Sequence, residues 1–234
     1  MRLRPRLCVL LALSLALIAA PVARGPAAQP VHAGARSLAE LERDLKDPAP
    51  GTRLRAVAAL ALLGAPAAPS LVRALEDGSV DVHTRRVVAL SLASIIPATD
   101  ETIAALIRSL GDIDTAVQDN ATWVLRKLGP RALAAITSAM SDQDLRIRHS
   151  AAGIVATSLA LGQMGPVPGE TLSALIGALS DRDPDVRATA ARALGDAGPA
   201  AKPAVAGLQK LAASDPVDYV RSVAGHALDK IGRP

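Results

Sequence analysis

The chain has 234 residues, of which 50% are hydrophobic, but it contains no phenylalanine, one tryptophan and one tyrosine. The formal net charge is +4, yet four arginines (Arg2, Arg4, Arg6 and Arg24) lie in an N-terminal segment that precedes every acidic residue, so the remainder carries 22 basic and 22 acidic residues. Balanced charge and scarce aromatic rings argue against a nucleic-acid-binding protein. The single cysteine, Cys8, excludes internal disulfide bonds.

The N-terminus has the pattern of a secretory signal peptide. A basic stretch, Met1–Arg6, precedes 14 largely apolar residues, Leu7–Ala20, which are too few to span a bilayer. We expect a signal peptide over residues 1–23, with cleavage as late as Ala33, and a flexible lead-in over 24–36, which is rich in Pro, Gly and Ala. The mature chain would then be periplasmic or secreted without stable membrane insertion, or membrane-anchored if the signal is not cleaved.

From residue 37 onward, apolar residues recur at helical spacing and polar turns separate the runs. The pattern predicts six pairs of helices: 37–46 with 52–63, 70–76 with 80–94, 100–110 with 115–128, 131–140 with 144–161, 172–179 with 184–194, and 204–213 with 216–231. Residues 162–169 contain three Gly and two Pro, so they are expected to be the longest connection.

The second helices of these pairs repeat one pattern, which is clearest in Val186, Ala190 and Leu194. Aligned on the first of these positions, the six anchor residues are Leu54, Val82, Val117, Ile147, Val186 and Val220. Asp stands five residues before the anchor in five units, and Arg follows it in four. One hairpin cannot bury both of its apolar stripes, but stacked copies can, so the sequence predicts an all-α solenoid.

This pattern of Asp, aliphatic-Arg, Ala and Leu-Gly resembles the HEAT repeat of the armadillo-like superfamily, most closely the short variety of the phycobilisome lyases. The resemblance covers residues 37–232 and implies a right-handed α-solenoid of about six HEAT-like hairpins. It also implies a structural ladder in which a turn Asp and a second-helix Arg bond between neighbouring repeats. The residues expected in this ladder are Asp142, Arg148, Asp181, Arg187, Asp215 and Arg221.

No catalytic, cofactor-binding or metal-binding set emerges from the sequence. The four histidines, His32, His83, His149 and His226, form no i, i+4 pair, and the chain has no His-Glu dipeptide. HEAT-like relatives include phycobilin lyases and deoxyhypusine-hydroxylase-like oxidoreductases, whose metal ligands are His-Glu pairs. An enzyme of that kind is the alternative interpretation, and the missing His-Glu pairs disfavour it.

The function expected from the sequence is therefore a non-catalytic scaffold for another protein, or an assembly factor, with the oligomeric state left open. Six residues after each anchor, the outward position is occupied by Leu60, Val88, Trp123, Gly153, Arg192 and His226. We expect Leu60, Val88 and Trp123 to form an exposed apolar strip that binds a partner, which Arg192 and His226 extend. The alternative is that Leu60 and Trp123 pack between neighbouring helices.

Overall fold

The computed structural model describes residues 36–163 and 165–232 of the chain. In these residues it contains twelve α-helices, three short 3-10 helices and no strand, so the all-α expectation is confirmed. The predicted signal peptide and nearly all of the lead-in lie outside the described residues. Among the helices that are described, none is long and apolar enough to cross a membrane.

The helices follow one another with short connections. Their bounds are α2 (Leu38–Asp44), α3 (Pro50–Leu63), α4 (Ala68–Glu76), α5 (Val82–Ser91), α6 (Asp100–Ser109), α7 (Thr115–Leu128), α8 (Pro130–Ala139), α9 (Leu145–Ala160), α10 (Gly169–Ala178), α11 (Pro184–Asp196), α12 (Val205–Ser214) and α13 (Asp218–Ile231). The 3-10 helices are η2 (Ala65–Ala67), η3 (Leu92–Ser94) and η4 (Gly198–Ala204).

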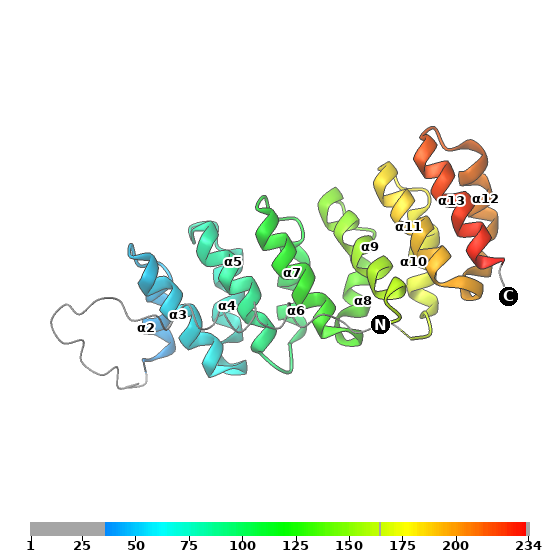
Figure 1. Ribbon diagram of the computed structural model, residues 1–234. Coiled ribbons are helices and arrows are strands. Elements are labelled where there is room, and N and C mark those ends of the chain that lie inside the picture. The colour runs from blue at the N-terminus through cyan, green and yellow to red at the C-terminus, as the bar shows by residue number, and fades with distance from the viewer. Residues whose placement is uncertain (1–35, 164, 233–234) are drawn as a thin grey trace, which may run out of the picture. The chain divides into compact units, whose positions relative to one another are not determined.

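Consecutive helices pair into hairpins, numbered here as repeats 1 to 6 from α2–α3 to α12–α13. The second helices α3, α5, α7, α9, α11 and α13 contact one another in that order and form one layer. In the other layer, α4, α6, α8 and α10 contact one another in the same way (Figure 1). Because each hairpin packs against the next, the core runs continuously between the two layers.

Local sequence explains where the second helices begin and end. Asp81, Asp114, Asp144 and Asp183 are N-caps whose carboxylates accept backbone amides of the first turn. At the other end, α3 and α7 stop at glycines with positive φ, a backbone conformation that side chains rarely adopt, and proline follows within two residues. The turns are therefore specified locally, before any packing between repeats.

The core of the second layer repeats one pair of residue types. A small or β-branched residue is followed four places later by a large aliphatic one, and the pairs are Ala56/Leu60, Val88/Leu92, Ala121/Leu125, Ala151/Val155, Ala190/Leu194 and Ala224/Leu228. All of these residues are buried except Leu228, which is half-buried in the last repeat. Small residues let neighbouring helices approach closely, so each layer of the core is thin.

Gly195 marks the closest approach of α11 to α13. A Cβ atom on Gly195 would lie 2.9 Å from the Cα of Ala227, which is backbone and cannot rotate away. We expect Gly195→Ala to destabilise the protein by about 1–3 kcal/mol, as overpacking of a core usually does.

Gly153 in α9 is the matched control, because a Cβ there would meet nothing within 4 Å. Gly153→Ala should stabilise the protein by up to about 1 kcal/mol through helix propensity. Denaturant unfolding of both variants measures the difference, and a stabilising Gly195→Ala would contradict the close packing of α11 and α13.

Candidate partner-binding surface

Each hairpin turns at an aspartate whose carboxylate accepts the backbone amide two residues further on, at 2.8–2.9 Å. The six residues are Asp47, Asp77, Asp112, Asp142, Asp181 and Asp215. This short bond mimics a backbone turn and fixes the direction in which the second helix starts.

In repeats 5 and 6 the turn aspartate also binds an arginine from the preceding repeat. Arg148 binds both carboxylate oxygens of Asp181, with N–O distances of 2.8 and 3.2 Å, and Arg187 binds those of Asp215 at 2.7 and 2.9 Å. Each arginine also donates to the carbonyl of its own turn, that of Asp142 at 2.9 Å and that of Asp181 at 3.0 Å. Each of these arginine side chains therefore links two repeats and also closes the turn of its own repeat.

These ion pairs are shielded from water, and this changes the pKa of the carboxyl groups. The hydrogen bond from Arg187 holds the pKa of Asp215 below its ordinary value. Burial raises the pKa of Asp181, but the hydrogen bonds from Arg148 and from the Asp183 amide outweigh it and leave that pKa lowered. Both carboxylates are therefore charged at neutral pH, and both pairs are intact.

Repeats 1 and 2 contain equivalent arginines, Arg53 and Arg85. Arg53 lies 2.6 Å from the carboxylate of Asp81, and Arg85 lies 3.5 Å from that of Asp112. Both also donate to a carbonyl of their own turn, as Arg148 and Arg187 do. The ladder therefore starts at the first hairpin.

Among the described repeats, the ladder has a gap between repeats 3 and 4, and its last arginine lies in repeat 6. At the gap, the side chain of Gln118 donates to the carbonyl of its own turn, and among the described residues no bond joins it to Asp142 in the next repeat. At the end, Arg221 donates to the carbonyl of Asp215 at 2.7 Å and pairs with Asp218 in its own helix. Of the six residues expected in the ladder, Asp142 and Arg221 thus bond within their own repeats, and the other four join neighbours.

The structure overturns the predicted exposure of Leu60 and Val88, which are both fully buried. The reason is that the first two repeats were aligned wrongly. The sequence alignment placed the ladder position directly after the anchors Leu54 and Val82, whereas the arginines that form the ladder are Arg53 and Arg85. The register therefore moves by two residues, and two residues turn a helix by about 200°. This rotation places the expected outward side chains in the core.

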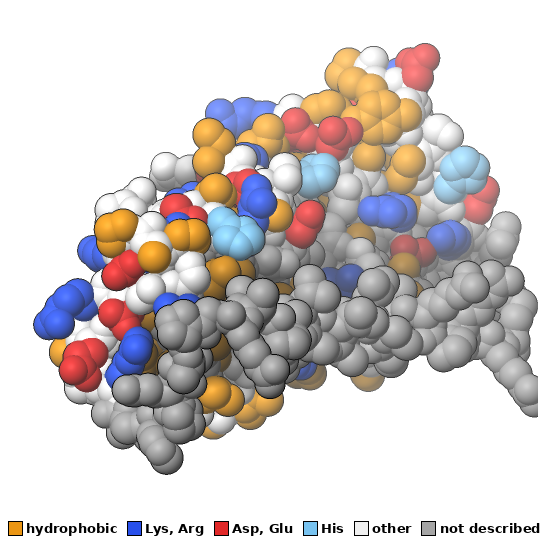
Figure 2. Space-filling view, turned by 60° about the vertical axis from the view of Figure 1, so that its left-hand side comes forward, with side chains coloured by type: hydrophobic (Ala, Val, Ile, Leu, Met, Phe, Trp, Pro, Cys, Tyr) orange, Lys and Arg blue, Asp and Glu red, His pale blue; other side chains and the backbone are white. Residues whose placement is uncertain are grey.

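In the corrected register, the residues five positions after each ladder arginine, or after Gln118 in repeat 3, point outward. We call them the outward row, and they are Ala58, Leu90, Trp123, Gly153, Arg192 and His226. Leu90 is 44% exposed and Trp123 is 38% exposed. The ammonium of Lys127 lies 5.2 Å from the centre of the Trp123 ring, within cation–π range. The predicted exposure holds for Trp123, Arg192 and His226, and Figure 2 shows a face on which hydrophobic side chains lie among charged ones and histidines.

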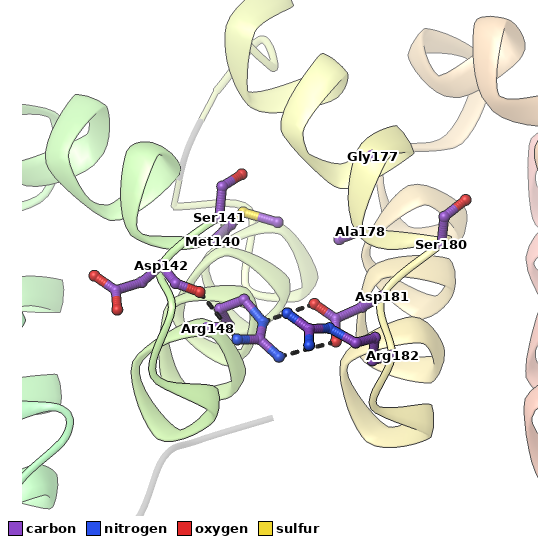
Figure 3. A pocket seen from close by; sticks show the side chains of 9 residues that line it. All are labelled: Met140, Ser141, Asp142, Arg148, Gly177, Ala178, Ser180, Asp181 and Arg182. Atoms are coloured by element: carbon purple, nitrogen blue, oxygen red, sulfur yellow. Dashed lines mark hydrogen bonds and ion pairs between the residues drawn. The ribbon is translucent and has the colours of Figure 1, made fainter.

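Between the turns of repeats 4 and 5 lies an open depression of about 290 Å³ (Figure 3). Arg148 and Asp181 face each other in it, and their charges are already paired. A second depression, of about 520 Å³, contains the equivalent pair Arg85 and Asp112. A ladder ion pair thus lines each depression, so the charges of these pairs are already neutralised.

Residues 154–229 match the sequence profile of HEAT repeats, and this segment includes the ion pair between Arg187 and Asp215. HEAT repeats are thus shown in this segment of the chain. The family resemblance expected from the sequence is thereby confirmed. A search of curated proteins finds no match.

Several solved structures are similar to this chain. A chain from a structure of microtubule plus-end tracking by XMAP215, CLIP-170 and EB1 has a TM-score of 0.60 and 16% identity, over 83% of this chain and 92% of that one. A designed armadillo repeat protein in complex with the peptide (KR)4 has a TM-score of 0.48 and 17% identity, over 84% and 100% of the two chains. Human deoxyhypusine hydroxylase has a TM-score of 0.42 and 19% identity, over 83% and 84%.

The sequence contained a signal for the correct register of repeats 1 and 2. With the structural register, Arg follows the reference position in five of six repeats, in Arg53, Arg85, Arg148, Arg187 and Arg221. In repeat 2 the misleading signal was Asp77, which lies five residues before α5, whereas the other turn aspartates lie three residues before their helices. Alignment on the arginine would have placed Leu90 on the surface.

Proposed function

We propose that this protein is a non-catalytic scaffold that binds a partner protein along the outward row of its second helices. The observation that carries the proposal is the exposure of Leu90 and Trp123 at equivalent places on neighbouring repeats. Large apolar side chains that stand together on a surface are typical of interaction sites, and Trp is enriched among the residues that dominate binding energy.

The ladder supports this function by fixing the second helices relative to one another. Buried, bidentate Arg–Asp pairs connect repeat 4 to repeat 5 and repeat 5 to repeat 6. A surface that is rigid before binding loses less conformational entropy when a partner arrives. Leu90 and Trp123 themselves stand on α5 and α7, whose contact is direct.

Chemistry along the outward row favours a partner with two kinds of side chain. Repeats 2 and 3 present Leu90 and Trp123, whereas repeats 5 and 6 present the exposed Arg192 and His226. A segment with apolar residues opposite the first pair and an acidic group opposite Arg192 would match both halves. Apolar contacts would supply affinity, and the charge would fix the direction of binding.

We further propose that the protein acts in the periplasm or at the cell surface, and that it has no enzymatic activity. The basis for export is the signal-peptide pattern of residues 1–23. The basis for a non-enzymatic role is that the sequence has no His-Glu dipeptide of the kind found in HEAT-like hydroxylases.

The test is capture of partners from an envelope extract by the wild type, by Leu90→Ala/Trp123→Ala and by Ile113→Ala. Ile113 is 87% exposed but lies in the turn before α7, outside the outward row, so it is the matched control. We expect a protein that the wild type and the control capture and that the double variant loses by at least tenfold, since two interface hot spots contribute about 2 kcal/mol or more each. Equal capture by all three would refute the outward row as the binding site.

A further inference from the structure

Repeats 4 and 5 bring together three side chains that are remote in the sequence. His149 lies on the exposed side of α9, Asp183 caps α11, and Asp185 lies in the first turn of α11. One ligand atom from each residue lies within 4.8 Å of the other two. The packing of α9 against α11 creates this cluster, which no spacing within a single helix would indicate.

The donor atoms suit one class of metal ion. Nitrogen and oxygen ligands bind Zn²⁺ at about 2.0–2.2 Å, so two ligands of one tetrahedral ion lie about 3.3–3.6 Å apart. The three donor atoms would therefore approach one another by about 1 Å when an ion binds, which exposed or half-buried side chains can do by rotation. Imidazole nitrogen suits Zn²⁺ and its first-row neighbours, whereas Mg²⁺ and Ca²⁺ prefer oxygen ligands alone.

Two of the three ligands are already held in place. One oxygen of Asp183 accepts the backbone amides of Asp185 at 2.9 Å and Val186 at 3.2 Å, and no described residue bonds its second oxygen. Asp185 accepts the hydroxyl of Tyr219, which comes from α13 in the next repeat. Hydrogen bonds of this kind orient the carboxylate ligands of metal sites.

We propose that His149, Asp183 and Asp185 bind a divalent first-row transition-metal ion such as Zn²⁺, with Tyr219 as the positioning residue for Asp185. The ion would link α9 of repeat 4 to α11 of repeat 5 beside the Arg148–Asp181 pair and would take its remaining ligands from water. Its role is structural, because it fixes the angle between two repeats. This proposal departs from the sequence-based expectation that no metal is bound.

Titration of the full chain with Zn²⁺ by isothermal calorimetry tests the proposal. We expect one ion per chain, an affinity at least tenfold lower in His149→Gln, and no change in His83→Gln, a matched variant of another exposed second-helix histidine. Zn²⁺ should also raise the melting temperature of the wild type and of His83→Gln but not that of His149→Gln, because a ligand that binds only the folded state stabilises it.

Further variants separate a metal site from a general attraction of cations. Tyr219→Phe should lower the affinity for Zn²⁺ about 10–100-fold, as loss of a hydrogen bond to a metal ligand typically does. Circular dichroism confirms that the variants fold. The proposal is overturned if the wild type binds no stoichiometric Zn²⁺, if His149→Gln binds it equally, or if Ca²⁺ binds as tightly as Zn²⁺.

Discussion

Replacement of Leu60 by alanine is expected to cost about 2–5 kcal/mol of unfolding free energy, the usual range for removing a buried leucine side chain. Leu60 is fully buried between the layers of repeat 1, although the sequence pattern placed it on the surface. The shortened side chain leaves a cavity that thin, alanine-rich layers cannot refill. Urea unfolding followed by circular dichroism measures the loss.

The control lies two residues further along the same helix. Leu62 is 89% exposed, so Leu62→Ala should change the unfolding free energy by less than about 0.5 kcal/mol. The two variants remove the same atoms, and only the side of α3 differs. Similar losses from both would mean that the register of the first repeat is not the one described.

Replacement of Asp215 by alanine is expected to cost about 3–5 kcal/mol, because it leaves the guanidinium of Arg187 buried without its counter-ion. The side chain of Asp215 is 3% exposed and that of Arg187 is 11% exposed, so water cannot replace the lost partner. The turn also loses the bond from Asp215 to the amide of Val217. The unfolding midpoint in guanidinium chloride measures the change.

A surface pair provides the comparison for this variant. Asp100 also pairs with an arginine, Arg131, but its side chain is 87% exposed, so Asp100→Ala should cost at most about 1 kcal/mol. A loss for Asp215→Ala no larger than that would show that the ladder contributes little to stability.

Acid gives a second measure of the same pair. The folded-state pKa of Asp215 lies below the ordinary value of 3.8, so the ion pair contributes its full stability above that pH and loses it as the pH falls through the lower folded-state pKa. The difference in unfolding free energy between the wild type and Asp215→Ala should therefore become smaller below about pH 3.8. A merely steric role of Asp215 would leave this difference independent of pH.

The order and type of the helices could be predicted from the sequence because the signals are local. Helical periodicity, N-cap aspartates and helix-ending glycines act within a few residues, and they place all twelve described helices. A long connection without regular structure was also expected, from its glycines and prolines, and it separates α9 from α10, whereas the equally long connections after α5 and α11 contain 3-10 helices.

The side on which a residue lies was harder to predict, as Leu60 and Val88 show. In an alanine-rich helix several stripes have similar hydrophobicity, so apolar spacing alone does not select one of them. The choice depends on Arg53 and Arg85, whose partners stand in the next repeat. Alignment on these arginines instead of on the apolar anchors selects the correct stripe.

The cluster of His149, Asp183 and Asp185 lay beyond sequence analysis. A search for ligands within one helix finds no pair, since the three residues meet only across the contact of α9 with α11. In a repeat protein the relevant neighbour is about one repeat length away, and the 39-residue spacing at this junction obscured it.

The dual bonding of the ladder arginines has a consequence for how such a chain can change in length. Arg148 and Arg187 each close their own turn and also bind the turn aspartate of the following repeat, so duplication of such a hairpin adds an arginine and an aspartate that neutralise each other. Loss of half a hairpin would leave either the arginine or the aspartate without its partner. Arg221 instead pairs with Asp218 in its own helix, so its charge is neutralised within the repeat that carries it.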